Sequence, residues 1–116
     1  MERTIMFRSG IILLLWLFVA QQATAGGDEV VTVIAKDYKF QPEEITVKVG
    51  ATVRWENHEK RQYHSAWFEV LGEEPGDYFF PGDIRERTFE KAGTYHYVCE
   101  PHQESHQMKG VVHVVE

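Results

Sequence analysis

Residues 45–56 read ITVKVGATVRWE, two short runs of alternating apolar and polar residues on either side of a glycine. Alternation with a period of two is typical of β-strands that bury one face. In the first run the odd-numbered positions are expected to point inward, and in the second run Val53 and Trp55 are. Gly50 can supply the left-handed position that a tight turn requires. The segment therefore predicts two consecutive strands of a half-buried sheet.

Similar strand-like runs recur along the chain, whereas no stretch of ten or more residues has a helical period. The predicted strands are residues 30–35, 45–49, 52–56, 65–71, 86–89, 94–99 and 111–115. Residues 72–83 hold glycines, prolines and aromatic residues without such a period, which predicts a long loop tied down by aromatic side chains. Phe40, Val53 and Trp55 are expected to anchor the core. We therefore expect an all-β protein, an antiparallel Greek-key β-sandwich of about seven to eight strands.

The amino-terminal 25 residues differ from the rest of the chain. Arg3 and Arg8 precede an apolar run over residues 11–20, and Ala23-Thr24-Ala25 follows it. This pattern predicts a secretory signal peptide over residues 1–25 and a mature domain over residues 26–116. The apolar run is about half of the roughly 20 residues that span a bilayer, so no membrane insertion is expected after cleavage. The predicted product is soluble and exported, to the periplasm in a bacterium.

The length of the chain limits the number of domains, and its charge limits the kinds of partner. The chain has 116 residues and a formal net charge of −6, and residues 26–116 alone hold 10 basic and 17 acidic residues. A segment of that length suits one small domain with a single core. Because the predicted domain is acidic, nucleic acid is not expected as a partner.

Cys99 is the only cysteine, so it cannot form an internal disulfide. Small exported domains commonly contain disulfides, and the alternatives here are an intermolecular bridge, a buried free thiol or a metal thiolate. The residues that follow favour the metal: His102 lies three positions on, and Met108 lies a little further in the same loop. Thiolate and thioether ligands favour Cu(I), while imidazole serves both oxidation states. The loop therefore predicts a copper ion that cycles between Cu(I) and Cu(II).

A trigonal copper site needs a second imidazole from elsewhere in the chain. His64 is placed to supply it, because it opens the predicted strand at residues 65–71. Two histidines, one cysteine and a distant methionine make up a blue-copper arrangement. The expected chemistry is transfer of one electron at a time, with one copper ion per chain.

These residues resemble the cupredoxin family, most closely its plastocyanin and pseudoazurin branch. Residues 40–42, 45–50 and 53–57 are similar to the opening strands of that family, and residues 93–110 are similar to its copper loop. The resemblance implies a small exported electron carrier with a cupredoxin-like sandwich. It implies His64, Cys99 and His102 as equatorial copper ligands and Met108 as the axial ligand. It also implies that His102 lies near the surface and is the point of electron exit.

The chain departs from the family pattern at two places. Five residues separate His102 from Met108, one more than the plastocyanin pattern has, and the inserted segment holds His106. His106 is thus an alternative axial ligand, which would give a copper site of altered geometry. Ser65 stands where the family leads one to expect asparagine, and its hydroxyl can still tie the two ligand loops together.

Electron transfer is preferred over two other classes of function. No two histidines are separated by a single residue and there is one cysteine, so neither a trinuclear nor a binuclear copper centre is expected and the protein is predicted not to be an enzyme. The alternative is a periplasmic copper-binding or delivery protein, although Met108 is the only methionine after the predicted leader. The expected partners are redox proteins, a cytochrome or an oxidoreductase, that dock transiently near His102 on a monomer.

Other polar residues are interpreted as solvated. His96 and His113 are expected on the exposed faces of their strands. His58, Lys60 and Arg61 are interpreted as an exposed turn, more readily than as a docking patch. A second polar set is interpreted as a soluble face that could also speed encounter with a basic partner. It consists of Glu69, Glu73, Glu74 and Asp77.

Overall fold

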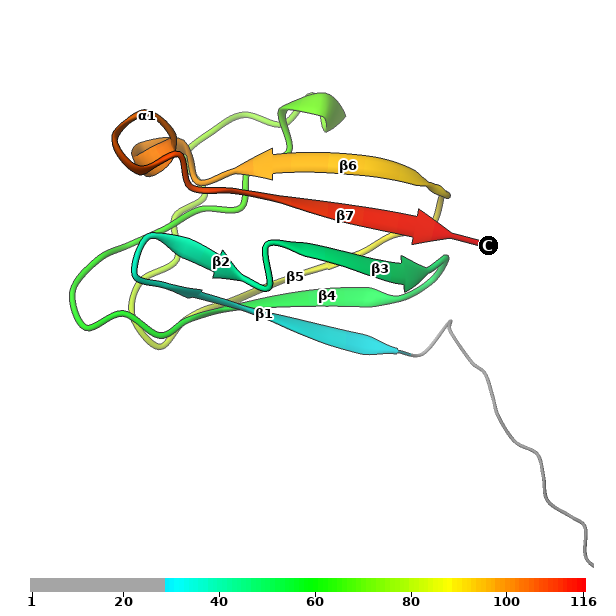
Figure 1. Cartoon of the computed structure of the whole chain (residues 1–116), viewed down its shortest axis with the longest axis horizontal. Helices are drawn as coiled ribbons and strands as arrows, with labels where there is room; N and C mark the ends of the chain where they lie inside the picture. Colours follow the sequence, from blue (N-terminus) through cyan, green and yellow to red (C-terminus); the bar gives the residue numbers. More distant parts are fainter. Residues whose placement is uncertain (1–28) are drawn as a thin grey trace, which may run out of the picture.

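The computed structural model of the protein describes residues 29–116, which form two packed β-sheets (Figure 1). The strands are β1 (Val30–Lys36), β2 (Lys39–Gln41), β3 (Glu44–Lys48), β4 (Thr52–Asn57), β5 (Ile84–Thr88), β6 (Gly93–Val98) and β7 (Lys109–Val115). One sheet has the strand order β2-β1-β4-β5 and the other the order β3-β7-β6. The predicted signal peptide, residues 1–25, and the predicted first residue of the mature domain, Gly26, lie outside the described residues.

The predicted inward faces are confirmed. Phe40, Val53 and Trp55 are all buried, as are the first two inward positions of β3. The Trp55 ring packs edge-on against Phe68 at 5.7 Å and against Tyr97 at 5.3 Å between ring centroids. Because each aromatic side chain removes a large apolar area from water, this cluster holds the two sheets together.

Two strand pairs differ from the antiparallel arrangement that the sequence predicts. β1 pairs with β4 in parallel, and β3 pairs with β7 in parallel, whereas the other pairs are antiparallel. Parallel neighbours need a crossover connection rather than a hairpin. Here the chain leaves the first sheet after β2, forms β3 in the second sheet and returns as β4. The alternation of residues predicts which face of each strand is buried, but it does not predict how the chain crosses between the two sheets.

The predicted strand over residues 65–71 is wrong. This segment makes one isolated bridge, between Trp67 and Val98, and then forms a 3-10 helix, η2 (Glu69–Leu71), which Gly72 ends with a φ of 75°. The buried residues Ser65 and Phe68 are three positions apart, so they cannot share one face of a strand. The sequence prediction also missed the short strand β2.

The loop predicted over residues 72–83 is confirmed. It contains no named strand or helix, and Phe79 within it is buried. Phe79 and His64 exchange two backbone hydrogen bonds, of 2.8 and 3.1 Å, which attach this loop to the segment after β4. The aromatic residue thereby positions a histidine that the sequence singled out.

The loop after β6 lies at one end of the sandwich. It contains a 3-10 helix, η3 (Glu100–His102), and the single turn α1 (Gln103–His106), which lies at the end of the molecule opposite the carboxyl terminus (Figure 1). Within residues 29–116, no helix combines the length and the apolar character needed to cross a membrane.

Candidate metal centre

Cys99 directly follows β6 and begins a closed loop. Its N–H donates to the carbonyl of Met108 at 2.9 Å, and its carbonyl accepts from the N–H of His102 at 2.9 Å. The first of these bonds continues the pairing of β6 with β7 by one more position. The two ends of the loop are therefore joined, and the loop carries a buried thiol at its start and a histidine three residues later.

His64 reaches the same place from the segment after β4. It is completely buried, and its Nδ1 lies 3.5 Å from the Cys99 Sγ. Its other ring nitrogen, Nε2, lies 2.9 Å from Oε2 of Glu59. A carboxylate on the remote nitrogen of a histidine fixes the orientation of the ring and favours a free lone pair on the other nitrogen. The Nδ1 of His64 is thus directed at the sulfur.

His102 completes a group of three donor atoms. Its Nδ1 lies 3.3 Å from the Cys99 Sγ, and one ligand atom from each of His64, Cys99 and His102 lies within 4.8 Å of the others. In the part of the chain that the structure describes, no other three His, Cys, Asp or Glu residues are grouped in this way. One sulfur and two imidazole nitrogens match the preference of copper, and the absence of carboxylate donors disfavours oxygen-seeking ions. The residues present therefore fit a copper ion.

Burial sets the protonation of this group. It raises the pKa of the Cys99 thiol to about 11, although the N–H of Ser65 points at the sulfur from 3.4 Å. Burial, followed by repulsion from His64 and His106, lowers the pKa of His102. Without a cation at neutral pH the thiol therefore keeps its proton, whereas the His102 imidazole is neutral and available as a ligand. A bound metal ion would replace the thiol proton.

The structure separates Met108 from His106. Met108 is 1% exposed and belongs to the same buried cluster as Cys99. His106 is exposed, and its ring stacks on Tyr38 with centroids 3.7 Å apart and an interplanar angle of 4°. The additional length of the loop is taken up by α1, after which Gln107, at a φ of 52°, turns the chain back to Met108. Of these two side chains, Met108 is the one buried with the donor group.

Ser65 ties the two ligand segments together, as the sequence predicted. Its Oγ accepts the N–H of Glu100 at 2.9 Å, and its own N–H donates toward the Cys99 Sγ. Both groups of Ser65 thus contact the cysteine loop. The side chain is buried, so water does not compete for these bonds.

Sequence reasoning missed two residues that contact the donor group, Glu59 and Tyr38. Glu59 lies between His58 and Lys60, which are exposed as predicted, and it was not separated from that polar turn. Its side chain is 11% exposed and turns inward to His64. The available signal was that Glu59 is the only acid in a basic turn five residues before His64. For Tyr38 the chain offers no local signal, because its contacts are with residues far along the sequence.

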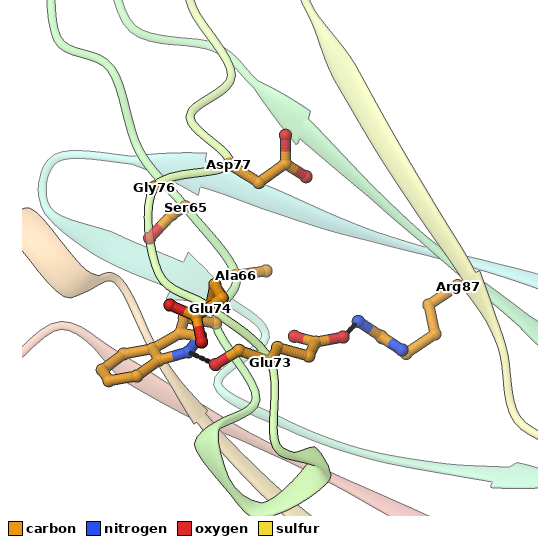
Figure 2. Close-up of a pocket in the computed structure, with 8 residues that line it drawn as sticks. Ser65, Ala66, Glu73, Glu74, Gly76, Asp77 and Arg87 are labelled. Atoms are coloured by element: carbon orange, nitrogen blue, oxygen red, sulfur yellow. Dashed lines mark hydrogen bonds and ion pairs between the residues drawn. The ribbon is translucent and has the colours of Figure 1, made fainter.

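A pocket of about 380 Å³ is lined in part by Ser65 and Trp67 (Figure 2). Glu73 on its wall is bonded to Arg87, and the Glu73 carbonyl accepts the indole N–H of Trp67 at 2.9 Å. Asp77 is paired with Arg85 at 3.0 Å. Two members of the predicted acidic set are thus paired with arginines, which leaves a weaker negative surface than the sequence suggests.

The remaining histidines are located as predicted, on strand surfaces. His96 is exposed, and His113 is 33% exposed with its Nε2 on Glu44. Neither is part of the donor group around Cys99.

Comparison with known proteins places this arrangement in a family. The cupredoxin-like domain matches residues 9–114. The chain is 38% identical to the plastocyanin of Scenedesmus fuscus over 86 residues, which covers 65% of this chain and 85% of that protein. The Cu(I) form of an amicyanin mutant matches with a TM-score of 0.66 at 36% identity, covering 75% of this chain and 83% of that one.

A copper enzyme also contains a similar domain. The nitrite reductase of Thermus scotoductus SA-01 matches with a TM-score of 0.66 at 31% identity, over 84% of this chain but only 25% of that one. The likeness is therefore to one part of a larger protein. With its two-sheet sandwich, its His-Cys-His donor group and a family match over most of its length, this chain belongs to the cupredoxin family.

Proposed function

We propose that this protein is a blue copper electron carrier that binds one copper ion through His64, Cys99 and His102, with Met108 as a weak axial ligand. The observation that carries the proposal is the grouping of two imidazole nitrogens and one sulfur within 4.8 Å of one another. When bound, copper in this ligand set supplies a one-electron couple between Cu(II) and Cu(I). The protein itself forms no bond to a substrate.

The residues around the donor group limit its movement. Phe79 holds His64 through two backbone hydrogen bonds, Ser65 joins the two ligand segments, and the Cys99 N–H pairs with Met108. A site whose ligands hardly move between oxidation states lowers the rearrangement that accompanies electron transfer. The rigidity of the sandwich is therefore part of the proposed function.

His102 is the proposed point of electron exit. It is the half-exposed member of the donor group, whereas His64 and Cys99 are buried. Two exposed aromatic residues extend from it, Tyr63 at 37% exposure and, with its ring 5.5 Å from that of Tyr63, Phe80 at 54% exposure. The Tyr63 ring lies 6.2 Å from that of His102. This small apolar face suits a redox partner that binds briefly and dissociates quickly.

The absence of enzymatic activity is part of the proposal. The matched nitrite reductase contains this domain as about a quarter of its length. A copper site between domains would need a second domain, and residues 29–116 form one two-sheet sandwich. Purified protein is therefore expected to oxidise or reduce a partner, but not to turn over nitrite or oxygen alone.

The predicted signal peptide supports an exported protein. We place it in the periplasm of a bacterium, where it would diffuse as a monomer between a donor and an acceptor. Fractionation of cells that express the full chain tests this placement. Size-exclusion chromatography with light scattering tests the monomer.

Visible spectroscopy and voltammetry of the copper-loaded protein test the function. We expect an intense thiolate-to-copper absorption and a reversible one-electron wave. Cys99→Ser should bind less copper and lose the absorption, while Glu104→Gln, an exposed change in the same loop, should keep both signals. A wild-type protein without a reversible wave that gives its copper quickly to a mild chelator would instead indicate copper delivery.

A further inference from the structure

The turn between β1 and β2 has an unusual backbone. Asp37 and Tyr38 are both in the left-handed region, with φ angles of 56° and 59°. Aspartate tolerates this conformation, but a bulky aromatic residue rarely adopts it. A strained residue of this kind persists only where surrounding contacts fix it, and such residues gather at functional sites. The contacts of Tyr38 therefore indicate what the turn is for.

The Tyr38 ring contacts both histidines of the cysteine loop. It lies parallel to the His106 ring, with centroids 3.7 Å apart, and edge-on to the His102 ring at 4.9 Å. The Tyr38 side chain is half-buried by these contacts. The ring of Tyr63 also lies near His102, with centroids 6.2 Å apart.

The backbone of Tyr38 contacts the other ligand segment. Its N–H donates to Oε2 of Glu59 at 3.4 Å, and the same oxygen lies 2.9 Å from Nε2 of His64. The left-handed conformation allows one residue to present its ring to the cysteine loop and its N–H to Glu59. The Tyr38 ring also lies edge-on to the His64 ring, with centroids 6.3 Å apart. Tyr38 is thus in contact with both imidazoles through its ring, and it is linked to His64 a second time through the Glu59 carboxylate.

We propose that Tyr38 is a positioning residue that holds the two imidazole ligands in a fixed arrangement, by stacking on His106 and by orienting Glu59. This inference rests on the proposed copper function. His106 then has a structural role instead of a ligand role, because its stack on Tyr38 attaches the longer loop to the β1–β2 turn. The extra residue of that loop provides the turn of α1 that brings His106 to Tyr38.

Four variants separate the contribution of the Tyr38 ring from that of the left-handed backbone. Tyr38→Gly removes the ring, keeps the N–H and accepts the left-handed backbone. Tyr38→Phe keeps the ring. His106→Ala removes the stacking partner. Asp37→Gly is the matched control, because it relieves the same backbone conformation at an exposed neighbour for which the structure shows no side-chain contact to the loop.

Copper release and electron paramagnetic resonance are the first readouts. Loss of one aromatic stack should speed copper release to a chelator about two- to ten-fold in Tyr38→Gly and His106→Ala. The same two variants should show broadened copper(II) signals, because His102 takes several orientations. Tyr38→Phe and Asp37→Gly should match the wild type in both measurements.

Proton NMR of the metal-free protein is the second readout. The His106 ring protons should be shifted upfield by the Tyr38 ring in wild type and Tyr38→Phe, and not in Tyr38→Gly. The inference is overturned if Tyr38→Gly retains wild-type copper release and spectra, or if the upfield shift is absent from wild type. If wild-type protein shows the shift but binds no copper, the proposed function fails while the stack stands.

Discussion

The surroundings of the Cys99 side chain disfavour its thiolate form. The side chain is fully buried, and the sulfur receives one backbone N–H from Ser65. The pKa of the thiol is raised to about 11 for this reason, so the metal-free protein keeps a neutral thiol under physiological conditions. The Cys99 thiolate is therefore stable in this site only when a metal cation is bound.

The first prediction is an alkaline loss of stability in the metal-free protein. Between the ordinary thiol pKa of 9.0 and the folded value of about 11, the unfolded chain loses the Cys99 proton while the folded chain keeps it. The contribution of this thiol is therefore fully present below pH 9.0 and lost as the pH rises to about 11, by an amount of order 1 to 2 kcal/mol. Urea unfolding of wild type and Cys99→Ala over this range measures it.

The difference between the two proteins isolates the cysteine from other titrating groups. Tyr97, whose pKa burial also raises, is present in both proteins and cancels. If Cys99→Ala loses stability as steeply as wild type does over this interval, the thiol is not the group responsible.

Glu59 brings a negative charge to the remote side of a proposed ligand. Its Oε2 is 2.9 Å from Nε2 of His64, in a position that is 11% exposed. A carboxylate near copper stabilises the more positive oxidation state, and little water screens it here. Glu59 should therefore lower the reduction potential of the centre.

The second prediction concerns Glu59→Gln, which keeps the shape and removes the charge. The reduction potential should rise, and copper affinity should fall about 10-fold or more. Lys60→Gln, an exposed change in the same turn, is the control. Spectroelectrochemical titration measures both potentials, and an unchanged or lower value for Glu59→Gln would contradict this role.

For single residues, the sequence predicted the metal-donating side chains better than the side chains that orient them. Cys99, His102 and His64 were identified by donor type, and the structure brings these three together. Glu59 and Tyr38 were missed, because a carboxylate or an aromatic ring acquires its role from the residue that it contacts in space. The choice between Met108 and His106 also depended on which side chain the loop buries, and that depends on how the extra residue is accommodated.

At the level of elements, the pairing of β6 with β7 positions the cysteine loop. Tyr97 lies opposite Gly110, and the last paired positions, Val98 and Lys109, lead directly into Cys99 and Met108. A Cβ at Gly110 would overlap the phenol ring of Tyr97. The two strands can therefore approach closely only because this position is a glycine.

The third prediction is that Gly110→Ala destabilises the fold and disturbs the copper centre together. Overlap with a buried ring should lower the free energy of unfolding by about 1 to 3 kcal/mol. Lys109→Ala, an exposed neighbour in the same strand, should change it by less than about 0.5 kcal/mol. Denaturant unfolding and the visible spectrum are the measurements. A stable Gly110→Ala protein with wild-type colour would show that the close approach is unimportant.

Element prediction succeeded where the alternation was strict and failed where tertiary pairing decides. β3 and β4 were found together with their buried faces, because their sequences alternate. Residues 65–71 were predicted as a strand, although the buried positions there do not alternate. β2 spans only three residues, too few for a periodic signal. The two parallel pairs follow from the route of the chain between sheets, which no local pattern encodes.

For the molecule as a whole, the net charge opposes the association of two copies, whereas the apolar face formed by Tyr63 and Phe80 favours it. The chain carries a formal net charge of −6, so two copies repel each other at a distance. The exposed residues Tyr63 and Phe80 favour contact once two molecules meet near His102. The arginine pairs of Glu73 and Asp77 reduce the local negative charge without removing the overall repulsion.

The fourth prediction follows for electron self-exchange between oxidised and reduced protein. Because salt screens repulsion between like charges, the rate should rise about three-fold or more between low and high ionic strength. Nuclear magnetic resonance line broadening in mixed samples measures this rate. A rate that falls as salt is added would mean that complementary charged patches, rather than an apolar face, bring the two molecules together.

In the proposed copper centre, one sulfur and two imidazole nitrogens of this sandwich bind a single copper ion. X-ray absorption at the copper edge of the loaded protein tests it most directly, because it counts the sulfur and nitrogen neighbours of the metal. We expect one short copper–sulfur bond and two imidazole nitrogens, with the sulfur lost in Cys99→Ser. A spectrum of oxygen and nitrogen neighbours without that sulfur, unchanged by the substitution, would contradict it.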